Sequence, residues 1–153
     1  MNTTSTPQTN ATSLASKKNN GDDFDAAKLI ENWQQVNEQV AQASVQAQRQ
    51  KDEIILLAVS KTKPVEMIAT LARQGQHDFG ENYLQEAIEK IQALRQQADC
   101  EHIVWHYIGS IQRNKTRDIA EHFDWVQTLE REIIAKRLNE QRPAELPALN
   151  VLI

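Results

Sequence analysis

The sequence predicts an α/β fold with a parallel sheet, either wound on both faces or curling into a (β/α) barrel. Two observations carry this prediction. Short apolar runs alternate with amphipathic helical segments, which gives five expected strands and four connecting helices between residues 54 and 153. In addition, no two of these runs are joined by a two-residue hairpin signal, so neighbouring strands are expected to be parallel.

The first expected strand, residues 54–60, is a continuous apolar run that is typical of a strand buried on both faces. Because side chains alternate along a strand, Leu57, Val59 and Lys61 should share one face. Lys61 would then lie at the carboxyl edge of the sheet, where α/β proteins bind their ligands. Partial desolvation there would lower the pKa of Lys61 and free its amine for Schiff-base chemistry with an aldehyde. A lysine that only reaches out to water is the commoner outcome for this position taken alone.

The other elements follow from the same periodicities. Apolar residues at helical spacing predict a helix from residue 24 to about residue 49, which should pack against the domain rather than form a coiled coil. Pro64 suits the first position of the next helix, and Gly75 suits its end. Further strands are expected at 77–82, 103–109, 123–129 and 149–153, and further helices at 83–97, 115–121 and 131–142.

Composition narrows the class of protein. The length of 153 residues suits one domain, residues 24–153, preceded by a polar tail, residues 1–23, that is expected to be disordered. A net charge of -4 argues against a nucleic-acid or membrane-surface binder. The single cysteine, Cys100, and the lack of a signal peptide or membrane span predict a cytoplasmic protein.

The carboxyl terminus is unusual because Ile153 falls inside the last expected strand. A parallel strand that ended there would present unpaired backbone groups and bare apolar side chains. We therefore expect a truncated chain that holds about the first five strands of an eight-stranded (β/α) barrel.

Candidate site residues other than Lys61 have structural explanations of their own. Asn82, with Gln85 three residues later, resembles a helix capping box, and His106 near the end of a strand is typical of a hydrogen-bonded core histidine. A basic cluster at residues 113–117 suits either an anion or a solvated helix face. The glycines form no phosphate loop, and the histidines have no metal-ligand spacing, so we expect no metal site.

Several motifs nevertheless resemble one family, the pyridoxal phosphate homeostasis proteins, also called the proline synthetase co-transcribed family. The resemblance runs from about residue 29 to residue 153. The motifs that carry it are LLAVSKTKP at 56–64, FGENYLQE at 79–86, WHYIGSIQRNK at 105–115, HFDWV at 122–126 and LPALNVLI at 146–153.

The resemblance implies a (β/α) barrel like the N-terminal domain of alanine racemase. It implies that Lys61, and not Lys63, holds pyridoxal 5'-phosphate (PLP) as a lysine aldimine, with Asn82 and His106 around the cofactor. Family members act in intracellular PLP homeostasis without established catalysis, with PLP-dependent apo-enzymes as partners. The groups that hold the phosphate belong to later loops, expected beyond Ile153.

Two other functions stay open on the sequence. A racemase-like, PLP-dependent enzyme would use the same aldimine with a second acid/base group opposite the cofactor, for which His106 and Tyr107 are candidates. An interaction module built on the helix that begins near Phe24 would instead bind a protein partner independently of the cofactor.

Overall fold

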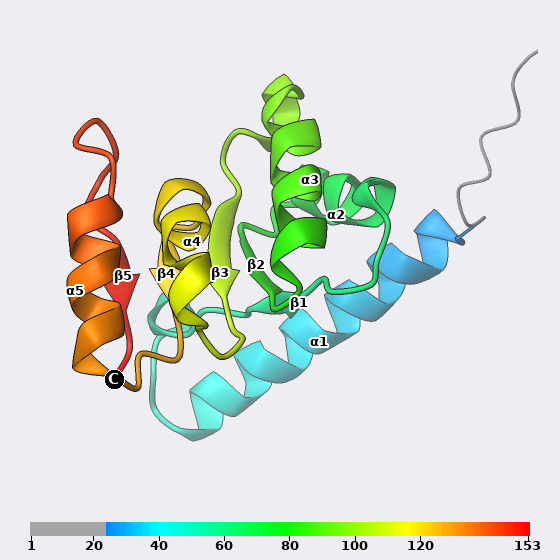
Figure 1. Cartoon of the computed structure of the whole chain (residues 1–153). Coiled ribbons are helices and arrows are strands. Elements are labelled where there is room, and N and C mark those ends of the chain that lie inside the picture. The colour runs from blue at the N-terminus through cyan, green and yellow to red at the C-terminus, as the bar shows by residue number, and fades with distance from the viewer. Residues whose placement is uncertain (1–23) are drawn as a thin grey trace, which may run out of the picture.

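The computed structural model describes residues 24–153, so the tail predicted for residues 1–23 lies outside the described residues. Helices and strands alternate along this part of the chain, as Figure 1 shows. The helices are α1 (Ala26–Gln46), α2 (Val65–Arg73), α3 (Leu84–Arg95), α4 (Thr116–His122) and α5 (Glu132–Gln141). The strands are β1 (Ala58–Val59), β2 (Asp78–Glu81), β3 (Val104–Tyr107), β4 (Trp125–Val126) and β5 (Asn150–Val151). Short 3-10 helices are η1 (Lys51–Glu53), η2 (Ala98–Cys100) and η3 (Arg113–Lys115).

The sheet has five parallel strands in the order β1-β2-β3-β4-β5, so each strand pairs with the next one in the sequence. This confirms the predicted α/β class and decides between its two forms. A doubly wound sheet reverses its strand order at a switch point, whereas a (β/α) barrel adds strands in one direction. The observed order is of the barrel type, and helices α2 to α5 follow the strands in sequence along the sheet (Figure 1).

The register of the strands divides their side chains between two faces. One face, here called the helix face, carries residues that pack against α2 to α5; its members are Phe79, Glu81, Trp105, Tyr107 and Val126. The other, here called the open face, carries the alternate residues of the same strands: Val59, Gly80, His106, Trp125 and Asn150. On the open face, Val59 of the outer strand β1 is 50% exposed, whereas Gly80 and His106 on the middle strands are buried.

The hydrophobic core lies between the helix face and the helices. In α3, Leu84, Ala87, Ile91 and Leu94 are buried at spacings of three and four residues, which places them on one side of the helix. That side packs toward β2 and β3, and the opposite side of α3 is exposed. Within residues 24–153, no helix combines the length and the hydropathy that crossing a membrane requires.

Helix α1 packs against the domain, as expected, rather than standing apart as a coiled-coil strand. The indole Nε1–H of Trp33 donates to Oε1 of Gln76, 2.8 Å away, in the turn before β2. The same glutamine side chain donates from Nε2 to the carbonyl oxygen of Leu56 at 2.7 Å. This contact explains why β1 is shorter than the predicted strand at residues 54–60: a side chain, and not a neighbouring strand, satisfies the backbone there.

The ends of α2 differ slightly from the prediction. Pro64 is the N-cap and Val65 is the first helical residue, one position later than expected. Gly75 lies just beyond the C-cap with a φ of 96°, which confirms the predicted helix stop. Glycine suits this position because a side chain would be strained at that φ.

Candidate functional site

A tight turn carries Lys61 at the carboxyl end of β1. The N–H of Lys63 donates to the carbonyl oxygen of Ser60 at 3.0 Å, and Thr62 has a φ of 62°. A turn with this hydrogen bond and with a positive φ only at its third residue is of type II. Threonine is β-branched and rarely adopts this conformation, which costs about 1–3 kcal/mol unless the surroundings hold it in place. The residue next to Lys61 is therefore strained.

Lys61 is exposed, so the partial desolvation expected from the sequence is wrong for this structure. The reason is that β1 ends at Val59, which places Lys61 in the turn and not on the strand. Among residues 24–153, no side chain forms a hydrogen bond or ion pair with its amine. Lys63 instead lines a cavity of about 160 Å³ between β1, α1 and α2, on the helix side of the strand. The two lysines of the Ser-Lys-Thr-Lys segment thus have different surroundings.

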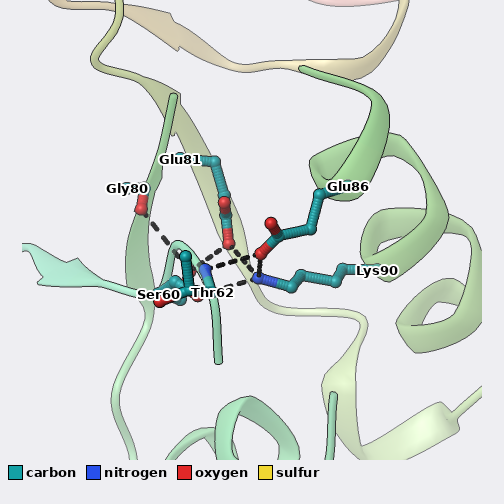
Figure 2. Close-up of polar contacts among 6 residues, drawn as sticks. All are labelled: Ser60, Thr62, Gly80, Glu81, Glu86 and Lys90. Carbon is teal, nitrogen blue, oxygen red and sulfur yellow. Dashed lines mark hydrogen bonds and ion pairs between the residues drawn. The ribbon is translucent and has the colours of Figure 1, made fainter. Parts of the chain in front are cut away.

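A buried ion cluster lies on the helix face next to this turn (Figure 2). The Lys90 ammonium donates to Oε1 of Glu81 at 2.9 Å and to Oε1 of Glu86 at 2.5 Å. It also donates to the carbonyl oxygen of Ser60 at 2.8 Å. The Lys90 side chain is 6% exposed and that of Glu81 is 0% exposed, so the charges pair with each other rather than with water.

The residues on both sides of Lys61 are tied to this cluster. The Ser60 hydroxyl donates to Oε1 of Glu81 at 2.7 Å, and the Thr62 backbone N–H donates to Oε1 of Glu86 at 2.6 Å. Figure 2 shows both contacts converging on the carboxylates that also bind Lys90. Contacts from β2 and α3 therefore fix the backbone of the Lys61 turn.

The ionisation of Glu86 reflects the same contacts. Burial alone would raise the pKa of its carboxyl group. The hydrogen bonds from Lys90 and from the Thr62 N–H outweigh this effect and hold the pKa below its ordinary value. Glu86 is therefore a carboxylate at neutral pH, which makes its hydrogen bond to the turn a strong, charge-assisted one.

Sequence reasoning missed this cluster, although one signal was available. Lys90 is 5% exposed and belongs to the buried side of α3 together with Ala87, Ile91 and Leu94. A lysine at a core position of an amphipathic helix needs a buried partner. Glu86, one helical turn earlier, is the partner that the sequence offered.

Asn82 follows β2 and does not cap α3, so the capping prediction is wrong. The N-cap is Tyr83, whose carbonyl oxygen accepts the first helical bond from the Ala87 N–H at 2.9 Å, and no side chain completes the cap. The Oδ1 atom of Asn82 is buried and has no hydrogen-bond partner among the described residues. Gly109 lies close by, and a Cβ atom there would come within 3.0 Å of the Asn82 Cβ.

His106 occupies the open face, where it is 3% exposed and both ring nitrogens have partners. The Gln127 amide N–H donates to Nδ1 at 2.9 Å, which leaves Nε2–H to donate to Oδ1 of Asp78 at 2.8 Å. The ring also stacks on Trp125, with a centroid distance of 5.6 Å and an interplanar angle of 7°. These contacts hold the imidazole in one orientation and occupy both of its polar atoms.

The topology places the predicted site residues along one region of the sheet. Lys61 and Asn82 follow adjacent, paired strands, and His106 is in register with Gly80, two residues before Asn82. In the predicted basic cluster, Arg113 is exposed and Arg117 pairs with Glu121 at 3.7 Å, as on a solvated helix face. Among residues 24–153, no group of three or more His, Cys, Asp or Glu side chains is placed to hold a metal ion.

The chain is similar to curated proteins named pyridoxal phosphate homeostasis protein. Those of Escherichia coli K12 and Pasteurella multocida are 50% and 52% identical over 125 residues, which is 82% of this chain and 53% of each relative. The protein of Vibrio cholerae is 48% identical over the same length. The chain thus spans about half the length of the curated relatives it matches. No family model matches it.

The chain is also similar in fold to several solved structures. PipY of Synechococcus elongatus without PLP is 38% identical, with a TM-score of 0.55 over 65% of this chain and 44% of PipY. PipY with PLP bound is 37% identical, with a TM-score of 0.53 over 67% of this chain and 47% of PipY. An unknown protein from Bifidobacterium adolescentis is 26% identical, with a TM-score of 0.67 over 78% of this chain and 51% of that protein.

Proposed function

Because this chain is homologous to the pyridoxal phosphate homeostasis proteins, we propose that it binds PLP through Lys61 at the carboxyl edge of its sheet. The observation that carries the proposal is the Lys61 turn. An amine with no partner among the described residues stands just beyond β1, while the residues before and after it are held by Glu81 and Glu86. This combination leaves the amine accessible on a fixed backbone.

The residues around the turn fit an aldehyde cofactor. Lys61 is the residue that would hold PLP, which would supply an aldehyde able to condense with the amine and release water. Asn82 offers a buried acceptor, Oδ1, that has no partner among the described residues and can receive a hydrogen bond from the cofactor. His106 would support the site indirectly, by holding Asp78 and Gln127 in place, because both of its ring nitrogens are already hydrogen-bonded.

We favour a carrier over an enzyme, because the names of the relatives suggest a role in PLP homeostasis. The alternative, a racemase-like enzyme, needs an acid/base group opposite Lys61. His106 has no free nitrogen for this role. Tyr107 belongs to the helix face, where burial raises the pKa of its hydroxyl, and that hydroxyl donates to the carbonyl oxygen of Ser110 at 3.4 Å. A carrier would work in the cytoplasm and release PLP to apo-enzymes that depend on it.

The test is to incubate the full chain with PLP, reduce with borohydride and map the labelled lysine by mass spectrometry. We expect label on Lys61, loss of label in Lys61→Ala, and full labelling in the matched control Lys63→Ala. Label on Lys63, or spread over surface lysines, would contradict the site. Racemisation and transamination assays on the same samples address the alternative, since turnover that depends on Lys61 would replace the carrier by an enzyme.

A further inference from the structure

The backbone of the Lys61 turn has a conformation that a β-branched residue at position 62 disfavours. A type II turn differs from a type I turn by a flip of the central peptide, here the peptide between Lys61 and Thr62. A flip to type I would give Thr62 a negative φ, which suits a β-branched residue better than the observed 62°. Something outside the turn must therefore keep the peptide in its present orientation.

Glu86 is the group that does so. Its Oε1 atom accepts the N–H of the Lys61–Thr62 peptide at 2.6 Å, and a flip of that peptide would turn the N–H away from the carboxylate. The donor belongs to the strained residue itself, so the hydrogen bond acts directly on the peptide that sets the direction of Lys61. No other side chain has to transmit this effect from Glu86 to the peptide.

The position of Glu86 is fixed in turn by the buried lysine on the same helix. Lys90 lies one helical turn later and contacts Oε1 of Glu86 at 2.5 Å. Its ammonium also binds the carbonyl oxygen of Ser60 and Oε1 of Glu81. One ammonium thus joins the residue before Lys61 to the carboxylate that binds the residue after it (Figure 2).

We propose that Glu81, Glu86 and Lys90 are positioning residues that lock the Lys61–Thr62 peptide in its type II orientation and so aim the Lys61 amine at the aldehyde of PLP. The inference rests on the proposed function, because the amine is its target. The three residues act through the backbone and do not touch the cofactor. Their effect should therefore appear in the rate at which Lys61 captures the aldehyde.

The experiment mixes the full chain with PLP, quenches with borohydride at timed intervals and measures labelled Lys61 by mass spectrometry. Glu86→Ala should slow capture about tenfold, equal to about 1.4 kcal/mol, because the peptide is then free to flip. Glu86→Gln should restore most of the rate, since the amide keeps an acceptor oxygen at the same reach. The matched control is Glu89→Ala on the exposed side of α3, where the Glu89 side chain accepts a hydrogen bond from Gln85 and from no other residue among 24–153, and it should not change the rate.

A double-mutant cycle separates positioning from a general loss of stability. Glycine adopts both signs of φ, so in a Thr62→Gly background the turn depends less on Glu86. The effect of Glu86→Ala should then shrink from about tenfold to about twofold. If the two substitutions instead act independently, Glu86 does not work through the Thr62 conformation and the proposal is wrong.

The outcomes for the two proposals can be told apart. Absence of label on Lys61 in the unmodified chain would overturn the proposed function. Normal labelling in the unmodified chain together with an unchanged rate in Glu86→Ala would overturn only the positioning role. Rates are compared per folded molecule, with the folded fraction taken from circular dichroism, so a variant that merely unfolds gives an unchanged rate and also counts against positioning.

Discussion

The amino and carboxyl ends of strands β1 and β2 differ in how their polar groups are paired and in which residue has a positive φ. At the amino end, one buried side chain, Gln76, satisfies every polar atom that it contacts. Its Nε2 donates to the carbonyl oxygens of Leu56 and Asp78 at 2.7 and 2.8 Å, and its Oε1 accepts from Trp33 at 2.8 Å. The positive φ at this end falls on a glycine, Gly75, where it costs little.

At the carboxyl end of the same two strands, one residue is strained and buried polar atoms lack hydrogen-bond partners among the described residues. The positive φ falls on Thr62, and two buried oxygens, Oε2 of Glu81 and Oδ1 of Asn82, have no partner among the described residues. Strain and unsatisfied polar groups concentrate at functional sites because the surrounding structure can hold them there. This contrast supports the proposed binding site at the carboxyl end, where barrels bind ligands, and assigns a stabilising role to the amino end.

The largest expected effect is at the amino end. Gln76→Leu would leave the carbonyl oxygens of Leu56 and Asp78 and the indole N–H of Trp33 without partners in the interior. We expect a loss of about 3 kcal/mol in the free energy of unfolding, measured by urea denaturation. Labelling of Lys61 per folded molecule should stay unchanged, and a Gln76→Leu protein as stable as the unmodified chain would show that Gln76 does not stabilise the amino end.

A pair of substitutions, one at Gly75 and one at Thr62, tests the two positive-φ positions of this comparison and should have opposite effects on stability. Gly75→Ala should lower the free energy of unfolding by about 1 kcal/mol, because no atom lies within 4 Å of the new Cβ and only the backbone conformation opposes it. Thr62→Gly should raise it by up to about 1 kcal/mol, because the glycine removes the strain. Thermal or urea unfolding of both proteins gives the answer, and a loss of stability in Thr62→Gly would show that the turn is not strained.

Asn82 offers a smaller test of the carboxyl end. Asn82→Ala removes a buried oxygen that has no partner among the described residues, so the free energy of unfolding should change by less than about 0.5 kcal/mol. The affinity for PLP, measured by absorbance titration, should nevertheless fall. A large loss of stability with unchanged affinity would reverse the role assigned to this residue.

The smallest expected effect concerns pH. The pKa of Glu86 is lowered in the folded chain, so its contribution to stability is present above the ordinary carboxyl pKa of about 4.3 and is lost as the pH falls through the lowered value. Its side chain is 34% exposed, which limits the contribution to below about 0.5 kcal/mol. The measurement is the difference in free energy of unfolding between the unmodified chain and Glu86→Gln from about pH 7 to about pH 3. A difference that grows on acidification would contradict the sign.

The sequence predicted the class of fold and the order of its elements, because buried parallel strands and amphipathic helices leave strong periodic patterns. It placed the end of the first strand too late, since the amide of Gln76 takes the place of a neighbouring strand at Leu56. The conformation of Thr62 was not predictable, because it opposes the local preference of a β-branched residue and depends on a contact with Glu86 across 24 positions. The environment of His106 likewise depends on partners from other strands, which only the register brings together.

The stacking of Trp125 on His106 has a practical consequence. This indole lies in the same register row as Gly80 and Val59, next to the region where we propose that PLP binds. PLP bound at the proposed site would accept excitation energy from this indole and lower its fluorescence. Trp33 stands at the far end of the strands beside Gln76 and would respond less. Binding of PLP at the proposed site should therefore be measurable as a loss of tryptophan fluorescence, and Trp125→Phe should reduce that loss.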